Sequence, residues 1–106
     1  MSELVDEQPF ETIAHVRIKG RVQGVWYRGW VVQEASALGL SGWVRNRADG
    51  SVEALFAGDS STVGKMLVAC RKGPPSALVT EVAPVKYPDA LMPPLELGRF
   101  VKQGTV

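Results

Sequence analysis

The segment from Gly20 to Arg28, GRVQGVWYR, has the residue types of an anion-binding loop. It joins a predicted strand to the start of a predicted helix, where unpaired backbone N–H groups and the positive end of the helix dipole favour a phosphate-sized anion. Gly20 and Gly24 allow sharp bends, so several N–H groups can converge on one point. Arg28, in the first helical turn, can reach that point with a bidentate guanidinium. The segment therefore contains all the groups needed to bind a phosphate, but no nucleophile.

A plainer interpretation of the same segment is also open. The glycines would only turn the chain, and Arg28 would be a solvent-exposed helix residue. Two glycines and one arginine are common, so the spacing alone slightly favours this plainer interpretation.

Positive charge is concentrated in the same part of the chain. The net charge of the whole sequence is only +1. Between residues 12 and 47, however, six basic residues accompany one acidic residue, a local net charge of +5 that leaves −4 for the rest. This asymmetry favours one small, dianionic ligand near the loop over a long polyanion, which would need positive charge over more of the surface.

Length and composition exclude several classes of protein. A chain of 106 residues, 45% of them hydrophobic, fits one domain that can bury a core without a disulfide or a metal. Its single cysteine excludes disulfide scaffolds and cysteine-rich zinc modules. No apolar run approaches the roughly 18 residues of a membrane span, and residues 1–11 are acidic and unlike a signal peptide. We therefore expect a cytoplasmic domain over residues 12–103, preceded by a disordered lead at 1–11.

Hydrophobic periodicity predicts the helices and strands that must position the loop. It predicts strands at 12–19, 42–47, 52–56, 76–86 and 97–102, and helices through 27–38 and 63–72. Asp49-Gly50 predicts a hairpin turn, and Asp59 is a candidate N-cap for the second helix. The order β-α-β-β-α-β predicts an α+β, ferredoxin-like sandwich. We expect an antiparallel sheet with two helices on one face and a short fifth strand at the C-terminal end.

Two blocks of the sequence resemble the acylphosphatase family. They are GRVQGVWYR at 20–28 and GWVRNRADGSVE at 42–53, and the match continues through LGLSG at 38–42 and GPPSA at 73–77. The resemblance implies a hydrolase of carboxyl-phosphate mixed anhydrides on the ferredoxin-like fold. It also implies catalytic roles for the arginine that ends the first block, Arg28, and for the asparagine of the second, Asn46.

The resemblance further implies how these residues act. The phosphate would be held by the Arg28 guanidinium and by the backbone N–H groups of a loop formed by Val22, Gln23, Gly24, Val25, Trp26, Tyr27 and Arg28. The Asn46 amide would orient the attacking water. A carboxylate leaving group of low pKa needs no strong general acid, metal, cofactor or protein nucleophile. The expected partners are an acyl phosphate and inorganic phosphate, with no nucleic acid, no membrane and a monomeric chain.

Three positions depart from the commonest form of the family pattern. Trp26 and Tyr27 stand where many members have Gly and Phe. Trp26 could either crowd the loop or line the acyl side of the site, so this departure bears on substrate preference more than on activity. Arg47 stands where some members have a hydroxyl residue, so we expect no hydroxyl helper beside Asn46. Gln23 is expected to brace the loop through a backbone group rather than to take part in catalysis.

Other residues have plainer expected roles. Cys70 is expected to be a buried thiol, and Trp30 and Trp43 are expected to anchor the core. His15, on the polar face of the first strand, is expected at the surface.

Two other functions fit the predicted fold. RNA-recognition modules share it and stack bases on the aromatic residues of their sheet, and Arg17, Lys19, Arg45 and Arg47 could line such a surface. Against this, the third strand carries Glu53 and lacks the aromatic motif of those modules. The other alternative is a non-catalytic accessory domain, of the kind found at the front of larger carbamoyl-transfer maturation proteins. A free-standing enzyme is the simpler expectation.

Overall fold

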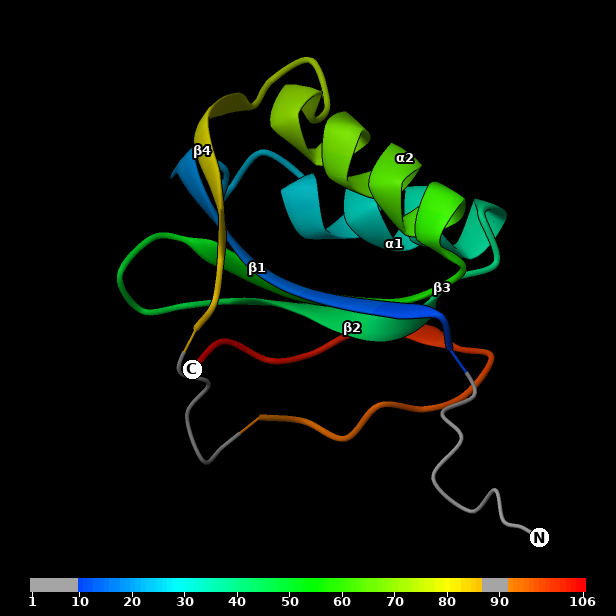
Figure 1. Cartoon of the computed structure of the whole chain (residues 1–106). Helices are drawn as coiled ribbons and strands as arrows, with labels where there is room; N and C mark the ends of the chain where they lie inside the picture. Colours follow the sequence, from blue (N-terminus) through cyan, green and yellow to red (C-terminus); the bar gives the residue numbers. More distant parts are fainter. Residues whose placement is uncertain (1–9, 87–91) are drawn as a thin grey trace, which may run out of the picture.

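The computed structural model describes residues 10–86 and 92–106, and these residues form two helices and one sheet (Figure 1). The elements are β1 (Thr12–Arg21), α1 (Tyr27–Ala37), β2 (Ser41–Asn46), β3 (Val52–Gly58), α2 (Ser60–Lys72), β4 (Leu78–Pro84) and β5 (Phe100–Lys102). Most of the expected disordered lead, residues 1–9, lies outside the described residues, and the domain limits of 12–103 stay a prediction. Neither described helix is long and apolar enough to cross a membrane.

The sheet has the strand order β4-β1-β3-β2-β5. β1 pairs antiparallel with β3 and with β4, and β2 pairs antiparallel with β3, which confirms the ferredoxin-like plan. β5 differs from the expectation because it runs parallel to β2, so the sheet is mixed. β5 is also shorter than predicted: Gly98, with a φ of 77°, forms a turn, and pairing begins only at Phe100.

β1 continues two residues beyond its predicted end. After a register shift at Lys19, Gly20 pairs with Val79 and Arg21 pairs with Leu78 on β4. A Cβ on Gly20 would lie 2.1 Å from the backbone oxygen of Leu78, so only glycine permits this approach. The loop between β1 and α1 therefore begins at residue 22 rather than at residue 20.

Both helices cover one face of the sheet and enclose the core with it (Figure 1). As predicted, Cys70 is buried there, and burial raises the pKa of its thiol to about 12. The buried hydroxyl of Tyr27 donates to the backbone oxygen of Cys70 at 2.7 Å, which ties the start of α1 to the end of α2. Trp30 packs half-buried against the core. The predicted helix included Leu38, but α1 ends at Ala37, and Leu38 is 36% exposed.

The other face of the sheet carries a buried ionic cluster of His15, Arg45, Arg47 and Glu53, and residues 92–99 run along that side of the molecule (Figure 1). Glu53 Oε1 accepts from Arg45 Nε at 2.8 Å and from Arg47 Nη1 at 3.1 Å. Its Oε2 lies 2.5 Å from His15 Nε2. The surface position expected for His15 is therefore wrong: its side chain is 11% exposed and its ring packs edge-on against the buried Trp43.

The Glu53 carboxylate makes the stability of the fold depend on pH. Burial alone would raise the pKa of Glu53, but the hydrogen bonds from Arg45 and His15, together with the charge interactions with both residues, hold the pKa below its ordinary value of 4.5. A carboxyl whose pKa is lowered in the folded state stabilises that state above its unfolded pKa. This contribution is lost as the pH falls through the folded pKa.

We expect Glu53→Gln to lower the free energy of unfolding at pH 7 by about 3–5 kcal/mol, because it removes the negative charge from a buried ion cluster. The variant should also lose less stability than the wild type between pH 6 and pH 3. Urea unfolding at both pH values measures the two effects. Glu81→Gln is the control, since Glu81 forms an exposed pair with Lys19 at 3.8 Å and its substitution should change stability by less than about 1 kcal/mol. Parallel stability curves for the wild type and Glu53→Gln would contradict this expectation.

Candidate active site

The loop between β1 and α1 is anchored by apolar side chains. Val22 is buried in the core, and Val25 packs against the core from the edge. Between them Gly24 has a φ of 75°, and after them Trp26 has a φ of 65°. These two left-handed residues turn the chain sharply into the first turn of α1.

The two helices begin differently. At α2 the predicted N-cap is confirmed: Asp59 accepts from the backbone N–H of Thr62 at 2.9 Å. At α1 the N-cap is Trp26, which makes no capping bond, and its first turn has no acidic residue. The N–H groups that open α1 thus have neither an intrahelical acceptor nor a capping side chain. Only the first helix therefore presents the open, positive terminus that suits an anion.

Gln23 fastens this loop to the β2–β3 hairpin. Its Nε2 donates to the backbone oxygen of Arg47 at 2.8 Å and to that of Ser51 at 2.7 Å. Arg47 and Ser51 close the hairpin through their own backbone bond of 2.9 Å. Because Arg47 follows Asn46 directly, the contact holds the loop beside Asn46, as expected for a bracing residue.

We expect Gln23→Ala to lower the free energy of unfolding by about 1–3 kcal/mol, because it removes two part-buried hydrogen bonds of about 0.5–1.5 kcal/mol each. The two carbonyls keep their backbone donors, the N–H groups of Gly50 and Arg47. Gln23→Glu tests whether the side chain acts by hydrogen bonding or by size, since a carboxylate of similar size cannot donate to either carbonyl. Urea unfolding of both variants distinguishes a role in hydrogen bonding from a role in filling space. Wild-type stability in Gln23→Glu would show that the side chain only fills space.

A cavity of about 180 Å³ lies where the loop, β2 and β5 meet. It brings together both predicted catalytic residues and most of the predicted loop, since it is lined by Val22, Gln23, Gly24, Trp26, Tyr27, Arg28, Gly29, Asn46 and Lys102. Val25 is the one predicted loop residue that does not line it. Sequence reasoning missed Gly29 and Lys102. No local signal indicates Lys102, because β5 reaches the site only through its pairing with β2.

The two predicted catalytic side chains have complementary polar groups. Arg28 is half-buried, and its Nη1 donates to the backbone oxygen of Gln103 at 3.1 Å, which fixes the guanidinium beside the end of β5. Asn46 is the last residue of β2, and its Oδ1 is buried with no hydrogen-bond partner among the residues that the structure describes. A buried acceptor without a partner is unfavourable unless a water or a ligand supplies the donor. The cavity thus combines a cationic group for an anion with an acceptor for a water.

The positive charge of residues 12–47 is not gathered at this cavity. Arg45 and Arg47 bond to Glu53, and Arg17 donates to Asp49 at 3.1 Å, on the sheet face opposite the helices. The expectation that charge along the sequence points to the loop is therefore only partly right. Arg28 and Lys102 are the cationic residues that line this cavity, and only Arg28 belongs to the charged segment.

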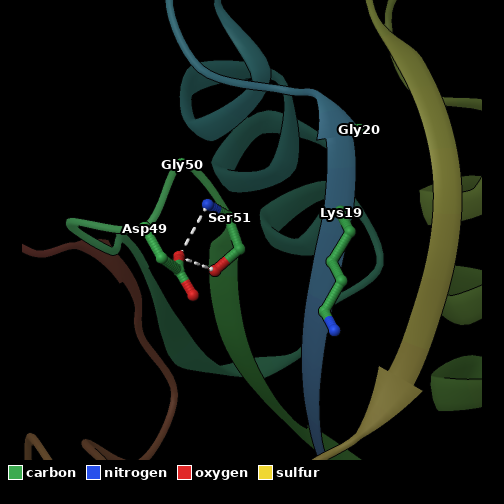
Figure 2. Close-up of a pocket in the computed structure, with 5 residues that line it drawn as sticks. All are labelled: Lys19, Gly20, Asp49, Gly50 and Ser51. Carbon is green, nitrogen blue, oxygen red and sulfur yellow. Dashed lines mark hydrogen bonds between the residues drawn. The ribbon is translucent and has the colours of Figure 1, made fainter.

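A larger cavity, of about 360 Å³, lies between the end of β1 and the hairpin (Figure 2). It is lined by Lys19, Gly20, Asp49, Gly50 and Ser51, and neither predicted catalytic residue reaches it. Asp49 Oδ1 accepts from the hydroxyl and the N–H of Ser51 at 2.6 and 2.9 Å, and these bonds lower the pKa of Asp49. An ionised carboxylate at its wall disfavours the binding of a phosphate dianion in this cavity.

Fold and cavity together define a ferredoxin-like protein with a small cavity at the start of its first helix. The sequence pattern of the acylphosphatase family matches residues 14–91. An acylphosphatase of Rhodospirillum rubrum is 66% identical over 76 residues, 70% of this chain and 84% of that protein. One from Acidiphilium cryptum is 52% identical over 91 residues, 86% of this chain and 94% of that protein. The crystal structure of acylphosphatase from Bacillus subtilis matches with a TM-score of 0.71 and 32% identity, over 86% of this chain and 97% of that chain.

The chain belongs to the acylphosphatase family. It is an enzyme, a hydrolase of acyl phosphates.

Proposed function

We propose that the chain hydrolyses acyl phosphates with Arg28 and the loop of residues 22–28 holding the phosphate and Asn46 orienting the water. One observation carries the assignment: an uncapped helix N-terminus, a cationic side chain and an unpartnered buried acceptor meet at a single small cavity. Each of these three features matches one need of the reaction, namely anion binding, charge neutralisation and placement of a water.

The phosphate dianion binds to the backbone N–H groups that lead into α1. The two left-handed residues, Gly24 and Trp26, shape this turn, and the helix dipole adds to its positive potential. The Arg28 guanidinium donates to a phosphate oxygen with a charge-assisted bond. Because these donors are fixed before the substrate arrives, they can stabilise the charge that develops on the phosphate in the transition state.

The water is held by Asn46. Its Oδ1 accepts one water O–H, which turns a lone pair of the water oxygen toward phosphorus. The new P–O bond forms as the bond between phosphorus and the acyl oxygen breaks, and the electron pair of that bond leaves on the carboxylate. The water proton passes to a phosphate oxygen, so that RCO–OPO₃²⁻ and H₂O give RCO₂⁻ and H₂PO₄⁻. The step needs no metal, because a carboxylate is already a good leaving group.

We also propose that the enzyme acts as a cytoplasmic monomer that binds neither nucleic acid nor membranes. The free thiol of Cys70 suits a reducing compartment. On the sheet face that RNA-recognition modules use for stacking, Trp43 has no exposed surface and Arg45 is 2% exposed. These burials disfavour base stacking there.

Hydrolysis of benzoyl phosphate in ¹⁸O-labelled water, with a metal chelator present, tests the proposed chemistry. Attack at phosphorus places the label in inorganic phosphate and leaves benzoate unlabelled, at a rate that the chelator does not change. Label in benzoate would show attack at the carbonyl carbon and would contradict the proposal. A rate that collapses with the chelator and returns with a divalent cation would show that a metal takes part.

A further inference from the structure

Trp26 stands at the cavity that holds Arg28 and Asn46, yet most of its side chain lies in solvent. Its exposed fraction is 60%, whereas the next residue, Tyr27, is buried in the core. The indole therefore contributes little to the packing of the fold. It offers a flat apolar surface beside the site that receives the phosphate.

The backbone holds Trp26 in an unfavourable conformation. Its φ of 65° and ψ of 23° are left-handed, and it is the only non-glycine residue with a positive φ in the described part of the chain. Large side chains rarely adopt this conformation, and such residues concentrate at functional sites. The position would accept glycine or asparagine more readily, so the indole itself needs an explanation.

Gly29 provides the space in which the indole lies. A Cβ built on Gly29 would lie 2.1 Å from Trp26 Nε1 and 2.6 Å from Cδ1. The ring thus packs directly against the backbone of the first turn of α1. Gly29 does not have a positive φ, so its lack of a side chain serves the indole rather than the backbone. Glycine is a poor helix former, so its presence in the first turn also lowers the intrinsic stability of α1.

The size of the cavity places the acyl group beside this ring. About 180 Å³ is well below the roughly 300–1,000 Å³ of pockets that enclose drug-sized ligands. With the phosphate on the N–H groups and a water at Asn46, the acyl group must extend past the rim. Trp26 is the large exposed aromatic among the residues that line this cavity.

We propose that the Trp26 indole is the platform for the acyl group and makes the enzyme prefer acyl phosphates with flat, apolar acyl groups over acetyl phosphate. The inference rests on the proposed function, because it assumes that the phosphate occupies the loop. An aromatic acyl group would stack on the indole, and an acetyl group is too small to gain much from it.

The test compares kcat and KM for benzoyl phosphate and acetyl phosphate in the wild type and three variants. Trp26→Asn removes the indole with a residue that tolerates a positive φ. We expect the ratio of kcat/KM for benzoyl phosphate to that for acetyl phosphate to fall about tenfold, or ~1.4 kcal/mol. The fall should come mainly from a higher KM for benzoyl phosphate, because a contact equal in ground and transition states changes KM rather than kcat.

The other two variants separate the ring from the loop. Trp26→Phe keeps an aromatic surface and should retain most of the preference. Gly29→Ala keeps Trp26 but displaces its indole, so the ratio should fall as it does in Trp26→Asn. If Trp26→Asn does not fold, these two variants still test the inference.

Two results would overturn the inference in distinguishable ways. The wild type could be active while Trp26→Asn and Gly29→Ala both keep its ratio of kcat/KM for the two substrates. This result would show that the indole does not contact the acyl group, and the proposed function would stand. A wild type that hydrolyses neither substrate would remove the proposed function and this inference with it.

Discussion

Asn46→Ala is expected to lower kcat for benzoyl phosphate by about 10²–10³-fold, the loss typical of one oriented polar group at a reacting centre. The buried, unpartnered Oδ1 of Asn46 is the acceptor that would hold the water, and alanine cannot replace it. The backbone oxygen of this residue, which accepts from the N–H of Val106 at 3.1 Å, is unaffected by the substitution. The loss should therefore reflect chemistry and not the fold of this edge of the sheet.

Inhibition by inorganic phosphate separates the role of Asn46 from phosphate binding. The inhibition constant should change by less than about threefold, since the phosphate is held by the loop and Arg28. Gln33→Ala, which removes an amide from an exposed position on α1, is the matched control and should keep wild-type kinetics. Wild-type turnover in Asn46→Ala would exclude the water-orienting role. A matching loss of phosphate affinity would instead place Asn46 on the phosphate.

Arg28→Ala is expected to raise the inhibition constant for inorganic phosphate by about 10- to 100-fold, because a hydrogen bond to a charged group contributes roughly 1.5–3 kcal/mol. The side chain is fixed beside the cavity by its bond to the backbone oxygen of Gln103. kcat/KM should fall at least as far, since charge develops on the phosphate in the transition state. Arg28→Lys should restore only part of the loss, because an ammonium cannot reproduce the planar two-point contact of the guanidinium.

Arg71→Ala is the charge control for this prediction. Arg71 lies in the last turn of α2 and lines a different cavity, so its removal changes the net charge equally without touching the site. Steady-state inhibition by phosphate at fixed ionic strength measures both variants. Equal effects in Arg28→Ala and Arg71→Ala would show that phosphate responds to the general field of the protein and not to a contact with Arg28.

Features that depend on neighbouring residues were predictable from the sequence. Asp59 before α2 follows from capping preferences, and the turn at Asp49-Gly50 follows from hairpin chemistry; the structure confirms both. The bracing contact of Gln23 was also expected, and the structure supplies its two acceptors, Arg47 and Ser51. The joint lining of one cavity by Arg28 and Asn46 matches what the two family blocks imply.

Features that depend on distant pairing were not predictable. His15 lies on a strand whose alternation indicates a polar face, but Glu53 on β3 bonds to both His15 and Arg45, and these three side chains are largely buried. Lys102 reaches the cavity because β5 pairs in parallel with β2 at the edge of the sheet. The local net charge along the sequence was a poor guide to the charge near the loop for the same reason. It does not show which cationic side chains pair with the carboxylates of the hairpin.

We expect phosphate to bind at the start of α1, within reach of Asn46. Titration of inorganic phosphate into ¹⁵N-labelled protein, followed by amide chemical shifts, tests it most directly. We expect the largest, saturable shifts at the backbone N–H groups of residues 23–28 and at the Asn46 side-chain amide, with the shifts weakened in Arg28→Ala. Shifts centred instead on Lys19, Gly50 and Ser51 would place the phosphate in the larger cavity and exclude binding at the start of α1.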